Sequence, residues 1–355
     1  MSEPAIVLAN ERFQTPDGKA AHGLVRGSSR YQIRAIVDPR CAGNDAGELL
    51  DGIFRDIPIV ATIAEAAERG EPPANTCVVG IATLGGRFDE AFREQLLIAV
   101  RNNLNIVSGL HDFVSDDPEI GAEAVARGLE IRDLRKPPPT SELHFWSGAI
   151  HTVKTPRIAV LGTDCGLGKR TTARLLVEAA NAAGIRAEMI YTGQTGWMQG
   201  ARYGFVLDSI VNDSVCGELE HALVQCEREA NPDLMVIEGQ SALRNPSGPC
   251  GAELLLSGGA RGVVLQHIPG QKYYEGFEEL GVEIPSLESE IELLRYYGAE
   301  TLAVSLNDRG LGPEEFQQAR QKLAAALDIP IVSPLIDGVG ELLSTVRDFM
   351  TREAR

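Results

Sequence analysis

The chain has 355 residues, 44% of them hydrophobic, and a formal net charge of −17 at pH 7. This length is enough for two domains with full cores. The acidic balance argues against nucleic acid as a partner, because phosphate backbones attract clustered lysine and arginine.

The beginning of the chain, MSEPAIVLANERF, lacks the basic segment and long apolar core of a signal peptide. No run approaches the roughly 18 apolar residues that predict a membrane span. The six cysteines form no CxxC pair and no histidine-paired spacing, which argues against a zinc site. Scattered reduced thiols are typical of a cytoplasmic protein. We expect a homo-oligomer that acts on a small molecule without membrane contact.

In the first half of the chain, short apolar runs alternate with helical patterns. Strands are predicted at 31–38, 57–61, 76–83 and 105–110, and helices at 62–70, 88–103 and about 119–128, the last of which leads to LEIRDLR (129–135). Such alternation favours a parallel, doubly wound sheet. The half contains no GxGxxG sequence, so NAD binding is not supported.

The segment KPPPTSELHFWSGAI (136–150) interrupts this alternation. Three consecutive prolines disfavour a helix and favour an extended linker. We therefore expect one domain over 1–140 and a second over 141–355, with the linker at about 136–155.

The second half resumes the alternation of strands and helices. Strands are predicted at 157–162, 186–193, 233–240, 261–268 and 301–307, and helices at 171–184, 213–230 and 313–327. The predicted fold class is therefore α/β, with two doubly wound parallel-sheet domains, the first Rossmann-like and the second like a P-loop NTPase.

The most informative stretch is GTDCGLGKRTT (162–172), which follows the apolar run IAVL. A strand, a glycine-rich loop, a lysine and a helix in this order can wrap an anion in backbone N–H groups and place the positive helix N-terminus beside it. The spacing is G-x5-G-K, one residue longer than the standard P-loop, and arginine replaces the Ser or Thr that normally follows the lysine. The predicted phosphate-binding residues are Gly162, Thr163, Gly166, Gly168, Lys169, Arg170, Thr171 and Thr172.

Other polar residues follow the predicted strands. Glu238 ends the apolar run LMVIE, where it would serve as a base or, with Thr171, hold magnesium if a nucleotide is bound. Lys169, Asp164 and His267 are the other predicted catalytic residues. The predicted substrate-binding residues, with Arg244 suited to pair with a carboxylate, are Thr192, Gln194, Thr195, Gln240, Arg244 and Lys272.

The loop and the VIEGQ sequence resemble those of dethiobiotin synthetase and the cobyrinic acid amide synthases, which carry a similar GTDTxxGKT loop. The longer loop spacing is the same in those enzymes, whereas Arg170 departs from their pattern. In that group ATP activates a carboxylate or carbamate.

A second resemblance covers nearly the whole chain. A family long described only as an uncharacterised domain joins a Rossmann-like half to a P-loop half, and its marks are GLH, DxR(K/H)P, GTDCxxGKxTT, TGQTG and EGQ. This chain has them at 109–111, 133–137, 162–172, 192–196 and 238–240. One branch of the family includes D-glutamate N-acetyltransferases, which use acetyl-CoA.

Three functions follow from these observations. The first is an N-acetyltransferase that uses acetyl-CoA on the amine of glutamate or a related acidic amino acid, and it depends mainly on the family resemblance. The second is a ligase or kinase that depends on ATP and magnesium, and it depends on the loop itself. The third is a nucleotide-binding regulator without turnover.

Overall fold

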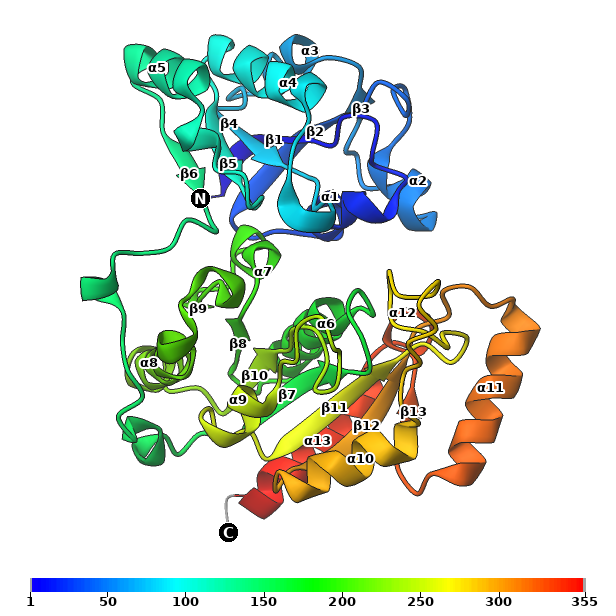
Figure 1. Ribbon diagram of the computed structural model, residues 1–355. Helices are drawn as coiled ribbons and strands as arrows, with labels where there is room; N and C mark the ends of the chain where they lie inside the picture. Colours follow the sequence, from blue (N-terminus) through cyan, green and yellow to red (C-terminus); the bar gives the residue numbers. More distant parts are fainter. Residues whose placement is uncertain (1, 354–355) are drawn as a thin grey trace. The chain divides into compact units, whose positions relative to one another are not determined.

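The structure is a computed structural model that describes residues 2–353, the side chain of Leu84 excepted, and the chain forms two compact units. The first unit runs to Pro138 and also includes Gln194–Gly200; the second comprises Pro139–Gly193 and the chain from Ala201 onward. Each is an α/β unit built on one parallel sheet, as expected (Figure 1). None of the helices described is long and apolar enough to cross a membrane.

The sheet of the first unit has the strand order β3-β2-β1-β4-β5-β6. This is the order of the Rossmann fold, and every neighbouring pair is parallel. The central strand β1 was not predicted, although its residues Ala5 to Leu8 are completely buried. The strands are β1 (Glu3–Leu8), β2 (Tyr31–Val37), β3 (Ile59–Val60), β4 (Thr76–Val79), β5 (Asn105–Ser108) and β6 (Ile131–Asp133).

Helices cover both faces of this sheet. One face packs against α3 (Ile63–Ala67), α4 (Glu90–Arg101) and α5 (Pro118–Arg127), and the other against α1 (Lys19–Val25) and α2 (Ala46–Asp51). The helix ends have clear local causes. The Asp89 carboxylate caps α4 by accepting the amide of Phe92 at 2.9 Å, and Gly128 ends α5 in the left-handed conformation.

The second unit contains a seven-stranded sheet of order β13-β12-β11-β7-β10-β8-β9, again with parallel pairs throughout. The strands are β7 (Arg157–Gly162), β8 (Ala187–Tyr191), β9 (Tyr203–Gly204), β10 (Leu234–Glu238), β11 (Gly262–His267), β12 (Glu300–Leu306) and β13 (Ile331–Val332). All strands therefore end at one edge, where loops of open α/β sheets bind ligands.

Helices of the second unit also lie on both faces. Buried side chains of α6 (Lys169–Ala182) and α13 (Gly340–Glu353) pack on one face. The other face packs against α8 (Asn212–Ala230), α9 (Ala252–Leu256), α10 (Leu287–Tyr296) and α11 (Pro313–Ala326), and the short α12 (Pro334–Asp337) follows β13. The helix predicted at 171–184 starts two residues earlier, because the lysine of the loop already adopts the first helical position.

A short segment from the second half of the chain belongs to the first unit. It contains α7 (Gln194–Met198), and its backbone carbonyl of Met198 accepts the Ser28 hydroxyl at 2.9 Å. The Gln199 side chain donates to the carbonyl of Gly23 at 2.7 Å. The alternation of strands and helices in the sequence did not predict that this segment belongs to the first unit.

The segment predicted as a linker is held against α8 in the second unit. Three glutamates of that helix accept backbone N–H groups from it: Glu218 from His144 at 2.7 Å, Glu220 from Ser147 at 2.7 Å and Glu227 from Lys154 at 3.1 Å. This part of the connection is therefore fixed by hydrogen bonds, although it has little regular secondary structure.

Candidate active site

The glycine-rich loop connects the end of β7 to the start of α6, as the sequence predicted. Gly166 has φ = 62° and Gly168 has φ = 107°, and only glycine adopts the second of these without strain. Within the described part of the chain, the amides of Gly166, Leu167 and Gly168 donate to no protein acceptor. The loop therefore offers consecutive N–H groups at the N-terminus of a 14-residue helix, which is the chemistry of a phosphate site.

Lys169 lies beneath this loop. Its Nζ donates to the carbonyl oxygen of Asp164 at 2.6 Å and to that of Ser241 at 2.8 Å. The side chain is buried, and burial lowers the pKa of its ammonium group below the ordinary value. The donor set of one lysine and free amides fits a phosphate or diphosphate group.

The carboxylate of Asp164 is completely buried and accepts four hydrogen bonds. Oδ1 accepts the amide of Cys165 at 2.6 Å and Asn245 Nδ2 at 2.9 Å, and Oδ2 accepts Gln271 Nε2 at 2.6 Å and the amide of Glu275 at 2.7 Å. Asp164 thus connects the glycine-rich loop to the segments after β10 and β11. These contacts favour an anchoring role over the catalytic role predicted from the sequence.

The hydroxyl residues of the loop differ in their surroundings. Thr172 is buried and donates to Gln266 Oε1 at 2.7 Å, which directs its hydroxyl toward the sheet. Thr171 is partly exposed and keeps its predicted place in the first turn of α6. Thr163 shares a hydrogen bond of 3.0 Å with Nδ1 of His267, so these two predicted residues are neighbours.

Glu238 ends β10, the strand next to β7, and its side chain is buried. Burial raises the pKa of its carboxyl above the ordinary value, although the charge of Arg170 acts in the opposite direction. Its Oε2 accepts the amide of Thr192 at 3.2 Å, and the Thr192 hydroxyl donates to the Glu238 carbonyl at 2.7 Å. Gln240 Nε2 donates to that same hydroxyl at 3.0 Å, so Thr192, Glu238 and Gln240 form one cluster.

His267 ends β11 on the other side of β7. Burial lowers the pKa of its imidazole to about 4. The ring is therefore neutral at pH 7. Since a group with this pKa holds a proton weakly at neutral pH, Glu238 is the better candidate for a general base.

The two cations predicted to bind a substrate carboxylate have different partners. Arg244 donates from Nε to Glu290 Oε1 at 2.7 Å and from Nη1 to the Ser289 hydroxyl at 2.8 Å. Lys272 is exposed and pairs with Glu283 at 2.9 Å. The Arg244 guanidinium is therefore held in a fixed orientation by partners in the second unit, whereas Lys272 is part of an exposed ion pair.

Gln194 and Thr195, also predicted to bind substrate, belong to the first unit. Gln194 Oε1 accepts Arg135 Nη2 at 3.1 Å, and Nη1 of the same arginine contacts Nε2 of His111. The sequence marks around 111, 135 and 194 therefore meet in one cluster. Its members come from three distant segments, and the sequence motifs alone did not show that they are neighbours.

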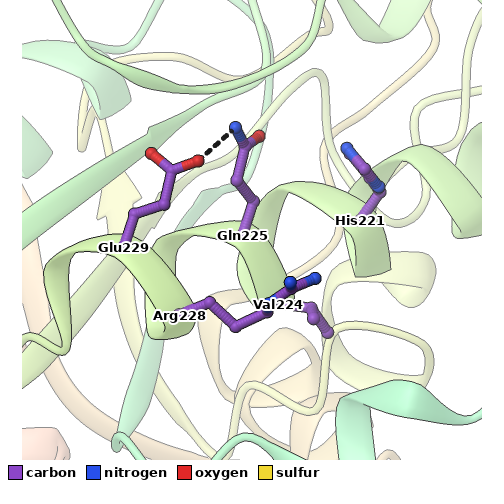
Figure 2. Close-up of a pocket in the computed structure, with 5 residues that line it drawn as sticks. All are labelled: His221, Val224, Gln225, Arg228 and Glu229. Carbon is purple, nitrogen blue, oxygen red and sulfur yellow. Dashed lines mark hydrogen bonds between the residues drawn. The ribbon is translucent and has the colours of Figure 1, made fainter.

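Figure 2 shows a hollow along α8, lined by His221, Val224, Gln225, Arg228 and Glu229. Gln225 Nε2 donates to Glu229 Oε1 at 2.8 Å, and all five side chains come from the same helix. None of them belongs to the glycine-rich loop or to a strand end. The candidate active site of the second unit is therefore the edge that carries Lys169 and Glu238.

Both halves of the chain match a family described as a domain of unknown function. Its P-loop domain matches residues 144–343, and its Rossmann-like domain matches residues 39–137. The chain belongs to the DUF1611 family. The family resemblance and the expected fold, two parallel-sheet α/β domains, are both confirmed.

A crystal structure of a DUF1611 family protein from Anabaena variabilis ATCC 29413 has the same fold. It superimposes with a TM-score of 0.87 at 29% identity and covers 98% of this chain and 100% of its own. Two curated relatives, from Pseudoalteromonas sp and Tritonibacter scottomollicae, are named D-glutamate N-acetyltransferase. Each is 29% identical to this DUF1611 chain over 80% of its length and over 84% of the relative.

The sequence did not single out several residues that complete the site of this DUF1611 protein. Gln271 and Glu275 bind Asp164, and Glu290 orients Arg244. Gln271 and Glu275 lie in the polar segment QHIPGQKYYEGF (266–277), in which only His267 and Lys272 were predicted as site residues, and Glu290 lies in α10. The sequence signal that could have revealed them is Asp164 itself, because an aspartate inside a loop of otherwise mostly small or apolar residues needs hydrogen-bond donors from other segments.

Proposed function

We propose that this DUF1611 chain is an N-acetyltransferase that moves the acetyl group of acetyl-CoA to the amine of D-glutamate or a related acidic amino acid. The observation that carries the proposal is its similarity, over 80% of the chain, to two proteins named for that activity. The geometry at the carboxyl edge of the second sheet supports the chemistry in three respects.

The first respect is the binding of the donor. Acetyl-CoA carries a diphosphate and a further phosphate. The free amides of Gly166 to Gly168 and the ammonium group of Lys169 suit such a group. Binding of acetyl-CoA is therefore sufficient to account for the P-loop, without a nucleoside triphosphate.

The second respect is the proton. The substrate amine is an ammonium ion at neutral pH and attacks the thioester carbonyl only after it loses a proton. Glu238 accepts that proton in our proposal, because burial raises the pKa of its carboxyl above the ordinary value and makes its carboxylate a stronger base. A C–N bond then forms, the C–S bond breaks, and the CoA thiolate leaves and takes up a proton.

The third respect is the substrate carboxylate. Arg244 is held by Glu290 and Ser289 through two of its three nitrogens. A guanidinium in a fixed orientation selects for a planar carboxylate, which an acidic amino acid provides.

A magnesium-nucleotide ligase or kinase is the second candidate. The loop and the acidic end of the neighbouring strand favour it, since Thr171 and Glu238 are the residue types that hold magnesium in P-loop enzymes. The two candidates differ in the ligand that the loop binds.

Calorimetric titration of the purified protein with acetyl-CoA and, separately, with magnesium-ATP distinguishes them. The acetyltransferase proposal expects saturable binding of acetyl-CoA. Binding of magnesium-ATP together with no heat from acetyl-CoA would reject it in favour of the ligase or kinase.

A further inference from the structure

Three side chains around Asp164 contain a buried polar atom without a hydrogen-bond partner. They are Nη2 of Arg244, the hydroxyl of Tyr274 and Oε1 of Gln271. In proteins most buried polar atoms are paired, because an unpaired one loses its hydrogen bonds to water without replacement. These three atoms lie in one neighbourhood and are available to bind a polar ligand.

The three side chains are connected through one carboxylate. Gln271 Nε2 donates to Asp164 Oδ2 at 2.6 Å, and the amide of Glu275, next to Tyr274, donates to the same oxygen at 2.7 Å. On the other side, Asn245 Nδ2, next to Arg244, donates to Oδ1 at 2.9 Å. Asp164 therefore gathers the segments after β10 and β11 beside the glycine-rich loop.

Tyr274 is the most buried of the three, with 2% of its surface exposed. Burial, with the nearby charge of Glu290, raises the pKa of its hydroxyl to about 12, so the hydroxyl remains a donor at neutral pH. The charges of Arg244 and Asp164 also act on this hydroxyl. The unpaired atoms are thus one guanidinium N–H group, one O–H group and one amide oxygen.

This set of atoms has a definite chemical preference. Two donors, one of them cationic, suit a carboxylate, and the amide oxygen of Gln271 suits an ammonium group. We propose that Arg244 and Tyr274 together bind the side-chain carboxylate of an amino-acid substrate and thereby determine specificity for acidic amino acids. The inference depends on the proposed acetyltransferase function for the identity of the reaction, but the binding itself can be measured without turnover.

The test compares Tyr274→Phe with a matched control, Thr301→Val. Thr301 in β12 also has a buried hydroxyl without a partner, but it lies at the start of its strand and pairs with Val263 near the start of β11, whereas the site lies where the strands end. Both variants lose one unpaired hydroxyl, so both should fold and melt at or above the wild-type temperature. Calorimetry then measures the binding of D-glutamate, and of D-glutamine as its neutral isostere, in the presence of CoA.

We expect Tyr274→Phe to weaken D-glutamate binding by about 10- to 100-fold, the loss typical of a hydrogen bond to a charged group, and to change D-glutamine binding less than about threefold. Thr301→Val should leave both unchanged. Equal D-glutamate affinity in Tyr274→Phe and wild type, or a failure of the wild type to bind any dicarboxylic amino acid, would overturn the inference.

These outcomes separate the inference from the proposed function. Binding that depends on Tyr274, without acetylation of any amino acid, would support the carboxylate site and reject the acetyltransferase. Acetylation of D-glutamate at the wild-type rate and KM by Tyr274→Phe would support the acetyltransferase and reject the carboxylate site.

Discussion

The ammonium group of Lys169 lies 2.8 Å from the carbonyl oxygen of Ser241, a residue whose φ of 40° is unusual for a side chain other than glycine. This contact joins the phosphate-binding loop after β7 to the segment after β10. That segment also carries Arg244. A phosphate that attracts Lys169 would therefore act on the segment that we assign to the substrate, which couples binding of the donor to binding of the acceptor.

Replacement of Lys169 by alanine should remove the main positive charge of the loop. We expect acetyl-CoA to bind about 10- to 100-fold more weakly, because a charge-assisted hydrogen bond contributes roughly 1.5–3 kcal/mol. Lys322→Ala is the matched control, since Lys322 is exposed on α11 and belongs to none of the predicted site residues. Titration calorimetry measures both. Unchanged affinity in Lys169→Ala would remove the loop from the donor site.

Asp164→Ala should act mainly on stability. It removes the carboxylate that accepts from Asn245 and the amide of Glu275, and one of the two acceptors of Gln271 Nε2. We expect the free energy of unfolding to fall by about 2–4 kcal/mol, because several buried donors lose a charged partner. Urea denaturation checks this, with Asp328→Ala at an exposed position as the control. A variant with full stability and no activity would instead assign Asp164 to the reaction.

The carboxylate of Glu220 should make stability depend on pH. Burial alone would raise its pKa, but hydrogen bonds from the Ser147 hydroxyl, the Ser147 amide and the Ile150 amide lower it below the ordinary value. A lowered pKa in the folded state means that the stabilisation is complete above the unfolded pKa of about 4.3 and is lost as the pH falls through the folded value.

Glu220→Gln tests this directly. We expect it to be less stable than wild type at pH 7, by about 1–3 kcal/mol, and to lose less stability on acidification. Glu178→Gln is the control, since its carboxylate is half exposed in a helical ion pair with Arg174. Urea denaturation at pH 7 and at pH 4 gives both values. Parallel pH dependence of Glu220→Gln and wild type would contradict the assignment.

The sequence was sufficient for the fold class because strands and helices alternate clearly in both halves. It missed strand β1. The run AIVL is short, and because it stands at the start of the chain, no alternation of strands and helices precedes it. Only the parallel pairing of β1 with both β2 and β4 makes it the central strand. Long-range pairing of this kind leaves little local signal.

The site was predictable where one motif carries it and not where several segments meet. The loop with Lys169 and the strand end with Glu238 follow from local spacing, and both lie at one edge of the sheet. By contrast, the packing of Gln194 in the first unit depends on side chains that are distant in sequence. The same holds for the hydrogen bonds around Asp164. Hydrogen-bond partners at such separations are set by tertiary packing, which no local pattern records.

Acetyl transfer by this chain is tested most directly by one turnover measurement. The purified chain is incubated with acetyl-CoA and D-glutamate, and free CoA thiol and N-acetylglutamate are quantified together, with Glu238→Gln in parallel. We expect equal amounts of the two products from the wild type and a rate at least about 100-fold lower from Glu238→Gln, the usual contribution of a general base. An absence of N-acetylated product from D-glutamate and other acidic amino acids, with release of ADP from magnesium-ATP in its place, would contradict the claim.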